Sequence, residues 1–308
     1  MISSLEHNLQ YYCIGGLTVQ VEASFPLTKH HFNPKFELFR LPTPEGDVIR
    51  VRHHLGLPDM HWVNRSQPHY GHAPWEIHHQ EQKWIYLGIP VEETGPAMHM
   101  VAIFDEQHAY GDIYHPDDRL FRAGNLDALT LIPTDQILLA RVLATRQACL
   151  LHACGMVIQG HGLAFVGHSE AGKTTTARML QDEGELLCDD RIIVRRWPEG
   201  FRVYGTWSHG DIPQVSASSA PLRAVFLLEQ APENHLTLLS PSQAVRALPE
   251  FVVKGLVTRD WWENVLDTLG HLARSVPVYR LRLDKSGAVV SLLREFLSQL
   301  DATPDKLP

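Results

Sequence analysis

Residues 167 to 174 read GHSEAGKT and match the pattern G-x-x-x-x-G-K-[ST] at each fixed position. Glycines at this spacing let backbone N–H groups converge on phosphate oxygens, and the N-terminus of a following helix adds positive potential. In such a loop Lys173 contacts the outer phosphates and the Thr174 hydroxyl binds Mg²⁺. The residues predicted to bind a nucleotide are Gly167, His168, Ser169, Glu170, Ala171, Gly172, Lys173, Thr174 and Thr175.

A pair of carboxylates follows this loop. Asp189 comes 16 residues after Lys173 and stands beside Asp190 in LLCDDRIIV, which we predict to be one apolar strand. Burying both acids is costly unless a cation or hydrogen bonds meet them. Because adjacent side chains of a strand point to opposite faces, we expect one acid to bind Mg²⁺ and the other to take a proton from an acceptor hydroxyl. The alternative is an exposed acidic turn, against which the apolar flanks argue.

The elements that would position these residues form a mixed α/β pattern. An apolar strand is predicted just before the loop, at 163–166, and a helix, TTTARMLQDEG, just after it. This context favours phosphate binding over an ordinary glycine-rich turn. The strand at 163–166 is predicted to pair with a strand at 150–160 as a hairpin that turns near 159–162. Further strands are predicted at 191–197, 201–207, 222–230 and 278–284, and helices at 134–147, 240–251, 259–276 and 285–300.

The N-terminal part has a different texture. Residues 1–130 are predicted to form a smaller, mostly β domain that takes part in acceptor recognition, with 131–308 as the catalytic domain; strands are predicted at 16–23, 47–55, 83–91 and 98–105. Thirteen of the 19 histidines precede residue 120, without H-E-x-x-H or nearby cysteines, so we expect surface and turn histidines rather than a metal site. Two interpretations, a recognition surface or a small core, are open for Trp62, Tyr70, Trp75 and Trp84.

Composition excludes several classes of protein. The formal net charge of −8 offers no basic surface for nucleic acid. No apolar run is long enough to span a membrane, and the N-terminus lacks the pattern of a secretory signal. The cysteines, which have no C-x-x-C spacing, are Cys13, Cys149, Cys154 and Cys188. We therefore expect a cytoplasmic protein with reduced thiols and with neither nucleic acid nor membrane as a partner.

The block HACGMVIQGHGLAFVGHSEAGKTTTARMLQDEGELLCDDRIIV resembles the HPr kinase/phosphorylase family, which shares a kinase fold with phosphoenolpyruvate carboxykinase. His152, the loop 167–174 and the triplet 189–191 match three pieces of that family in the same order. The resemblance covers roughly residues 130 to 300 and continues through GTWSHGD and APLRAVFLLEQ. These two segments are similar to the shorter relatives found beside bacterial peptide-modifying enzymes, including lasso-peptide precursor kinases.

The resemblance implies a P-loop kinase domain that uses ATP and Mg²⁺. Lys173 and the loop amides would bind the β- and γ-phosphates, Thr174 and Asp190 would bind Mg²⁺, and Asp189 is favoured as the base. His152 corresponds to the active-site histidine of the family, although it is also a natural start for a core strand. His209 would position metal or acceptor together with Asp211, an ordinary capped turn being the alternative. Arg191 would either neutralise phosphate charge or pair with the acids.

The chain also departs from that family. True HPr kinases carry another glycine at the position of Glu170, and their second, glycine-rich signature has no counterpart here. HPr itself is therefore not the expected acceptor. The first 125 or so residues do not resemble the N-terminal domain of HPr kinases. Relatives often assemble into oligomers, so a homo-oligomer is one expected state.

The expected function is an ATP- and Mg²⁺-dependent kinase that phosphorylates a serine-type hydroxyl of a peptide, protein or small molecule. One alternative is carboxykinase-like chemistry on a small acid, which ranks lower because no clear set of arginines and Mn²⁺ ligands is present. The other is a nucleotide-binding scaffold without catalysis. The charge of Glu170 beside a triphosphate favours this scaffold, whereas retention of both Asp189 and Asp190 favours chemistry.

Overall fold

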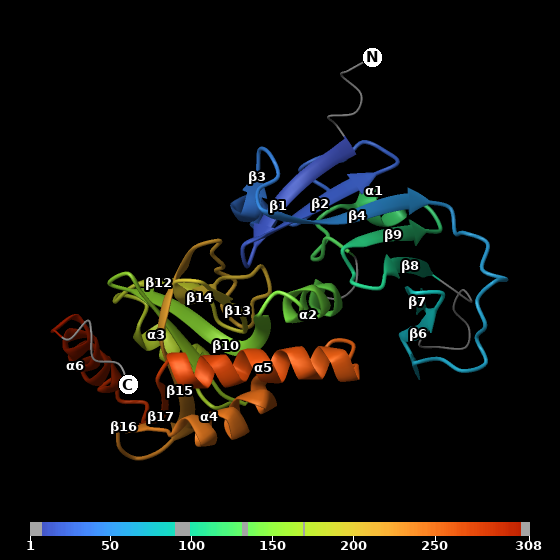
Figure 1. The fold of residues 1–308 in the computed structure, drawn as a ribbon. Coiled ribbons are helices and arrows are strands. Elements are labelled where there is room, and N and C mark those ends of the chain that lie inside the picture. The colour runs from blue at the N-terminus through green and yellow to red at the C-terminus, as the bar shows by residue number, and fades with distance from the viewer. Residues whose placement is uncertain (1–7, 90–98, 131–134, 169, 303–308) are drawn as a thin grey trace. The chain divides into compact units, whose positions relative to one another are not determined.

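The computed structural model describes residues 8–89, 99–130, 135–168 and 170–302 (Figure 1). The chain divides into two compact units, 1–138 and 139–308. The division falls inside helix α2 (Gln136–Ala144), the helix predicted at 134–147. None of the described helices is long and apolar enough to cross a membrane.

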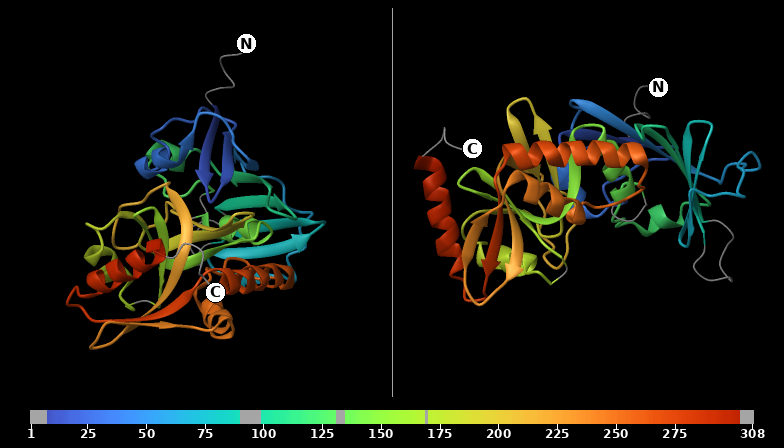
Figure 2. Two further views of the ribbon diagram at one scale, coloured as in Figure 1. Left: turned by 60° about the vertical axis from the view of Figure 1, so that its left-hand side comes forward. Right: turned by 60° about the horizontal axis from the view of Figure 1, so that its bottom comes forward.

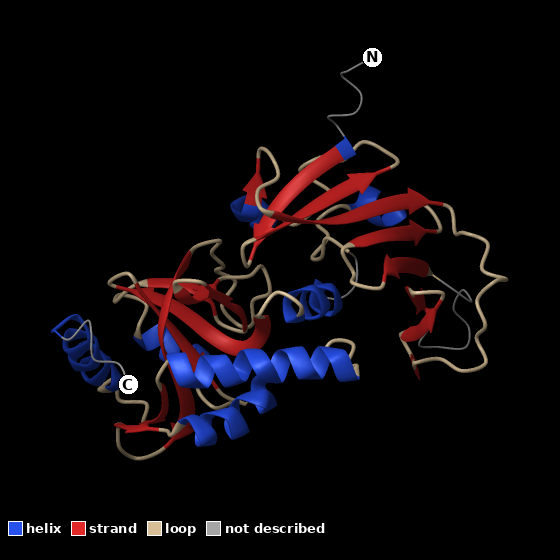
Figure 3. Cartoon of the chain, in the orientation of Figure 1, coloured by secondary structure: helices blue, strands red, loops and turns tan. Residues whose placement is uncertain are grey.

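The first unit is built on one mixed sheet, whose described strands lie in the order β3-β1-β2-β4-β9-β8-β7-β6-β5 (Figure 3). The strand β4 pairs in parallel with β2 and β9, and the other neighbours are antiparallel. The strands are β1 (Leu9–Ile14), β2 (Leu17–Ala23), β3 (Arg40–Leu41), β4 (Asp47–Leu55), β5 (Tyr70–His72), β6 (Trp75–Gln80), β7 (Lys83–Gly88), β8 (Met100–Asp105) and β9 (Tyr110–His115). Two short helices accompany them, η2 (Pro34–Phe39) and α1 (Arg119–Ala123).

Several histidines of this unit are interior residues. The expectation of surface histidines is wrong for His53, His78, His108 and His115, all of which are at most 1% exposed. Three of them lie on strands with the side chain facing inward, where polar partners compensate burial. His53 Nδ1 lies 3.0 Å from His115 Nε2, and His53 Nε2 lies 2.8 Å from the carbonyl oxygen of Leu129. Among the described residues no group of three or more His, Cys, Asp or Glu side chains could hold a metal ion.

The aromatic residues of this unit divide between core and surface. Trp84 is 3% exposed and belongs to the core, whereas Trp62 and Tyr70 are 42% and 45% exposed. Lys83 places its ammonium 5.9 Å from the ring centroid of Trp62. The exposed pair Trp62 and Tyr70 therefore remains a candidate recognition surface.

The second unit contains one sheet in the order β11-β10-β13-β14-β15-β17-β16, with β12 paired to β10 and a further pairing between β11 and β15. The long strands β10 and β15 each pair with different neighbours along their length. The strands are β10 (Ala148–Ile158), β11 (His161–Val166), β12 (Glu185–Cys188), β13 (Arg191–Trp197), β14 (Gly200–Tyr204), β15 (Ser219–Gln230), β16 (His235–Leu238) and β17 (Val278–Leu283). The helices are α3 (Lys173–Met179), α4 (Pro241–Ala247), η4 (Leu248–Phe251), α5 (Arg259–Ser275) and α6 (Val289–Ala302).

Helices cover both faces of this sheet (Figure 2). On β11, Ala164 and Val166 join the cluster packed under α5, and the alternate residues Leu163 and Phe165 join the cluster packed under α3 and α6. This alternation is the two-residue period of a strand that is buried on both sides. The end of β11, where the predicted phosphate loop begins, is thus fixed by packing from both faces.

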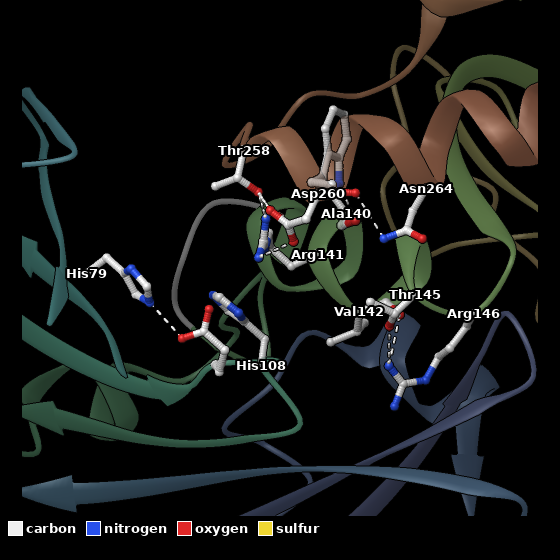
Figure 4. Close-up of polar contacts among 12 residues, drawn as sticks. His79, His108, Ala140, Arg141, Val142, Thr145, Arg146, Thr258, Asp260 and Asn264 are labelled. Atoms are coloured by element: carbon white, nitrogen blue, oxygen red, sulfur yellow. Dashed lines mark hydrogen bonds and ion pairs between the residues drawn. The ribbon is translucent and has the colours of Figure 1, made fainter. Parts of the chain in front are cut away.

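Helix α5 is tied to the middle of α2 by polar contacts (Figure 4). The Trp261 indole N–H donates to the carbonyl of Ala140 over 2.8 Å. The Arg141 guanidinium, which is 8% exposed, donates to the Thr258 hydroxyl over 2.6 Å and lies 3.7 Å from Asp260. These contacts hold the first turn of α5 against the segment that leads into β10.

Candidate functional site

The predicted phosphate loop connects the end of β11 to the start of α3. The strand ends at Val166, as predicted, and the helix begins at Lys173, one residue before its predicted start. The helix ends at Met179, five residues before the predicted end at Gly184. Gly172 has φ 106°, a left-handed conformation that glycine adopts without steric cost. A Cβ on Gly167 would lie 2.6 Å from the Cβ of Ala171, so the loop can fold back on itself only without a side chain there. Ser169 lies outside the described residues.

Lys173 is anchored within this loop. Its ammonium donates to the carbonyl oxygens of Gly167 and His168 over 2.8 and 2.9 Å, and the residue is 8% exposed. Burial lowers the pKa of Lys173, and the negative charges of Asp190 and Asp189 act in the opposite direction. Lys173 is therefore a buried amine that feels the charges of both acids.

Two further contacts hold the loop from outside. Glu170 has φ 67°, and its carbonyl accepts a hydrogen bond from the Gln230 side-chain amide over 2.6 Å. His168 lies 3.3 Å from the Glu250 carboxylate, and its ring lies 4.9 Å from that of Phe251. The loop is thus fixed from β15 on one side and from η4 on the other.

The two aspartates lie at a bend and not within one strand, which corrects the sequence prediction. The strand β12 ends at Cys188 and β13 begins at Arg191, so the acids occupy the two residues between them. The register of β13 on β10, with His152 level with Arg191, continues to Gly155 and Cys188 and shifts by one residue between Gly155 and Met156. Asp189 is buried and Asp190 is half-buried, and the Asp190 carbonyl still accepts from the Ala153 N–H over 3.0 Å. Both acids line one pocket, contrary to the expectation of opposite faces.

Asp189 is held by backbone amides. Its Oδ1 accepts from the Gly210 N–H over 2.7 Å and its Oδ2 from the Ile212 N–H over 3.0 Å, and the residue is 2% exposed. A Cβ on Gly210 would lie 3.2 Å from Asp189 Oδ2, so a glycine allows this close approach. Asp189 therefore positions the segment 210–212, and Asp211 with it.

Asp190 is held by charged or ionisable side chains. Its Oδ1 lies 2.9 Å from His152 Nε2 and its Oδ2 lies 2.5 Å from an Arg191 guanidinium nitrogen. Burial by itself would raise the pKa of Asp190, but the hydrogen bond from His152 and the charges of Arg191 and Lys173 hold that pKa below its usual value. The structure thus pairs Arg191 with a carboxylate, one of its two expected roles.

These residues line one pocket of about 650 Å³. Its predicted members are His152, Glu170, Gly172, Lys173, Thr174, Thr175, Asp189 and Asp190, and Asp211 joins them. Gly167, His168 and Ala171 support the loop and do not line the pocket. His209 is also not among the lining residues; its side chain is exposed and its Nδ1 lies 3.0 Å from the Gly210 carbonyl oxygen.

The sequence prediction missed two lining residues, Gln230 and Lys285. Both follow the buried parts of parallel strands, β15 and β17, whose carboxyl ends meet the phosphate loop at one edge of the sheet. A polar residue at the end of a predicted strand was the available signal. It could not be used without knowing which strands are neighbours.

The pocket is acidic for a site that would bind phosphate. Four carboxylates line it, from Glu170, Asp189, Asp190 and Asp211, against the two ammonium groups of Lys173 and Lys285. A polyphosphate would meet net repulsion there unless it brought divalent cations. The Thr174 hydroxyl and the carboxylates are oxygen donors of the kind that Mg²⁺ prefers, so the donor set fits this ion.

Known proteins are similar to about half of this chain. The structure of the HPr(Ser) kinase/phosphatase from Coxiella burnetii aligns with a TM-score of 0.31 and 11% identity, covering 49% of this chain and 98% of that chain. A likeness this low carries no argument. A search of curated proteins found no match. The family model "SynChlorMet cassette protein ScmC" matches residues 127–297, more than half of the chain. The chain therefore belongs to the SynChlorMet cassette protein ScmC family.

Proposed function

We propose that this protein is an ATP- and Mg²⁺-dependent kinase that transfers the γ-phosphate to a serine-type hydroxyl of a peptide, protein or small molecule. One observation carries the proposal: Lys173, Thr174, Asp189 and Asp190 line the same pocket at the start of α3. A phosphate loop alone binds nucleotides, whereas transfer also needs a carboxylate for the metal and a proton acceptor beside the outer phosphate. The pocket contains both acids.

In this proposal the loop amides and Lys173 bind the β- and γ-phosphates. The Thr174 hydroxyl and one carboxylate would hold Mg²⁺, which when bound neutralises phosphate charge. Lys173 reaches the phosphates by giving up its bonds to the carbonyls of Gly167 and His168. His152 lies beside Asp190 and would act on the transferred phosphoryl group or on the proton that the acid accepts.

The contacts of the two acids determine which variant tests the chemistry. An asparagine at 189 would present an NH₂ group to one of two backbone N–H donors, from Gly210 or Ile212, so Asp189→Asn disturbs the loop as well as any base. An asparagine at 190 keeps an oxygen for His152 or Arg191. Asp190→Asn is therefore the cleaner test, although the family resemblance favours Asp189 as the base.

The experiment incubates the full chain with γ-labelled ATP, Mg²⁺ and serine-containing peptides and small molecules. Wild type is expected to label an acceptor. If Asp190 accepts the proton, Asp190→Asn should lose label by at least about 100-fold, the usual contribution of general base catalysis, and keep calorimetric ATP binding. If Asp190 is the Mg²⁺ ligand, the variant should lose label and bind ATP with Mg²⁺ more weakly. Asp267→Asn on α5, which removes one carboxylate that is 63% exposed, is the matched control and should retain activity.

The outcomes separate the candidate functions. Absence of ATP binding with Mg²⁺ would refute the proposal. ATP binding without transfer to any acceptor, unchanged by Asp190→Asn, would support the nucleotide-binding scaffold instead. The scaffold is favoured by Glu170, an acidic residue that lines the pocket.

A further inference from the structure

The pocket has two chemically different ends. The parallel strands β11, β15 and β17 are neighbours, with Val166 level with Leu227 and Gln230 level with Leu283. Their carboxyl ends therefore lie at one edge of the sheet, in the order phosphate loop, Gln230, Lys285. On the other side of β11 lies β10, which carries His152 and pairs with β13 next to the acids.

This order of residues determines which end of a bound nucleotide would lie toward the acids and which toward Lys285. The acids, His152 and Asp211 lie on the β10 side of Lys173, and Gln230 and Lys285 lie on the β15 and β17 side. A γ-phosphate that is to be transferred must lie beside the acids. The α-phosphate and nucleoside must then extend in the opposite direction, toward Lys285.

Lys285 lies in a hydrogen-bonded turn between β17 and α6 and lines the pocket. The Asp284 Oδ1 atom accepts from the Ser286 N–H over 2.9 Å, from the Ser286 hydroxyl over 2.6 Å and from the Asn234 amide over 3.0 Å. Gly287, with φ 87°, completes the turn. These bonds fix the backbone on both sides of Lys285, so the position of its Cα is set before any ligand binds.

The Lys285 ammonium is available for a ligand. The residue is exposed and lines the pocket, and within the described part of the chain no carboxylate pairs with it. Its neighbours at this end are Gln230, whose amide nitrogen is engaged by the Glu170 carbonyl, and Glu170 itself. A cation without a counter-ion at the mouth of a pocket with excess carboxylate is suited to an anionic group that arrives with the ligand.

We propose that Lys285 binds the α-phosphate of the nucleotide and so sets the direction in which ATP lies across the loop. This inference rests on the proposed function, because it takes the ligand to be ATP with its γ-phosphate beside the acids. Lys285 is then a binding residue at the end of the site remote from transfer. Its loss should weaken binding without a matching loss of kcat.

The test is calorimetric titration of the full chain with ATP, tripolyphosphate and pyrophosphate, each with Mg²⁺. For Lys285→Met we expect about tenfold weaker binding of ATP and of tripolyphosphate, the effect of one charge-assisted contact. Pyrophosphate, which occupies only the β and γ positions, should bind as in wild type. Lys285→Arg should restore ATP affinity. Arg259→Met, which removes an exposed positive charge on α5, is the charge-matched control.

Each other result contradicts the inference in a distinct way. If Lys285→Met binds ATP as wild type does, Lys285 has no role and the proposed kinase is unaffected. If only ATP is weakened and tripolyphosphate is not, Lys285 contacts the nucleoside and the α-phosphate assignment is wrong. If pyrophosphate is weakened equally, the lysine acts on the whole pocket and not at one end. If wild type binds none of the three, the proposed function and this inference fail together.

Discussion

Lowering the pH from 8 to 5 should destabilise the sheet of the first unit through His53 and His115. Burial, with the charge of the partner histidine, lowers the pKa of His53 to about 3, and burial lowers that of His115 to about 4. In the unfolded chain both groups titrate near 6.5. The unfolded state therefore binds more protons between these values, so stability is complete above pH 6.5 and is lost as pH falls below it.

The magnitude follows from the two pKa values. At pH 5 both histidines remain neutral in the folded unit, whereas both are protonated in the unfolded chain. Each then costs about 2 kcal/mol, from 1.5 pH units at about 1.4 kcal/mol per unit, or about 4 kcal/mol together. Because neither is charged in the folded state at pH 5, their mutual repulsion does not alter this sum. A loss of this size is a large part of the stability of a typical domain.

Hydrogen exchange measured by mass spectrometry on the full chain is the assay. Amides of β4 and β9, corrected for intrinsic exchange rates, should lose protection by up to about 4 kcal/mol between pH 8 and pH 5. Amides of β15 in the same sample are the internal control, because no described histidine of residues 139–308 is buried. In His115→Leu the slope should fall from about two protons to one. Equal protection of β4 at the two pH values would refute the reasoning.

Four further predictions concern the second unit. Glu170→Gly should relieve a left-handed residue, stabilise the unit by about 1 kcal/mol and tighten binding of ATP with Mg²⁺; weaker binding by calorimetry would contradict this. Chelation of divalent ions should abolish ATP binding, since four carboxylates line the pocket, and equal heats with a chelator would be inconsistent with that charge balance. Gly205→Ala should lower Tm by several degrees, because its Cβ would lie 1.9 Å from the Ser216 carbonyl oxygen. In helix α5, Gly270→Ala meets nothing closer than 3.5 Å and should be neutral or stabilising.

Local patterns accounted for much of the second unit. Continuous apolar runs placed β11 and β13, alternating apolar residues placed β17, and the glycine spacing placed a turn between β11 and α3. These features depend on residues within a few positions of one another, so one chain suffices to predict them. The predicted helix at 285–300 begins later, at Val289, because Asp284 and Ser286 hydrogen-bond in a turn first.

The same local rules failed where the position of a residue depends on partners that are distant in the sequence. The segment LLCDDRIIV has the composition of a strand, yet its acids leave the strand to reach Gly210, Ile212, His152 and Arg191. The local sequence around the buried histidines of the first unit does not distinguish them from surface histidines. Their burial depends on partners such as His115 for His53, 62 positions away.

The sequence by itself determined the residues of the candidate site: a loop that matches a phosphate-binding pattern, a lysine and a hydroxyl in it, and two carboxylates close behind. These follow from residue types at short spacing, because backbone geometry over a few residues is a local property. The tertiary structure alone decided that the acids face one pocket and that Gln230 and Lys285 complete it. Which strand ends become neighbours is settled by pairing and packing across the whole unit, and no short stretch of sequence contains that information.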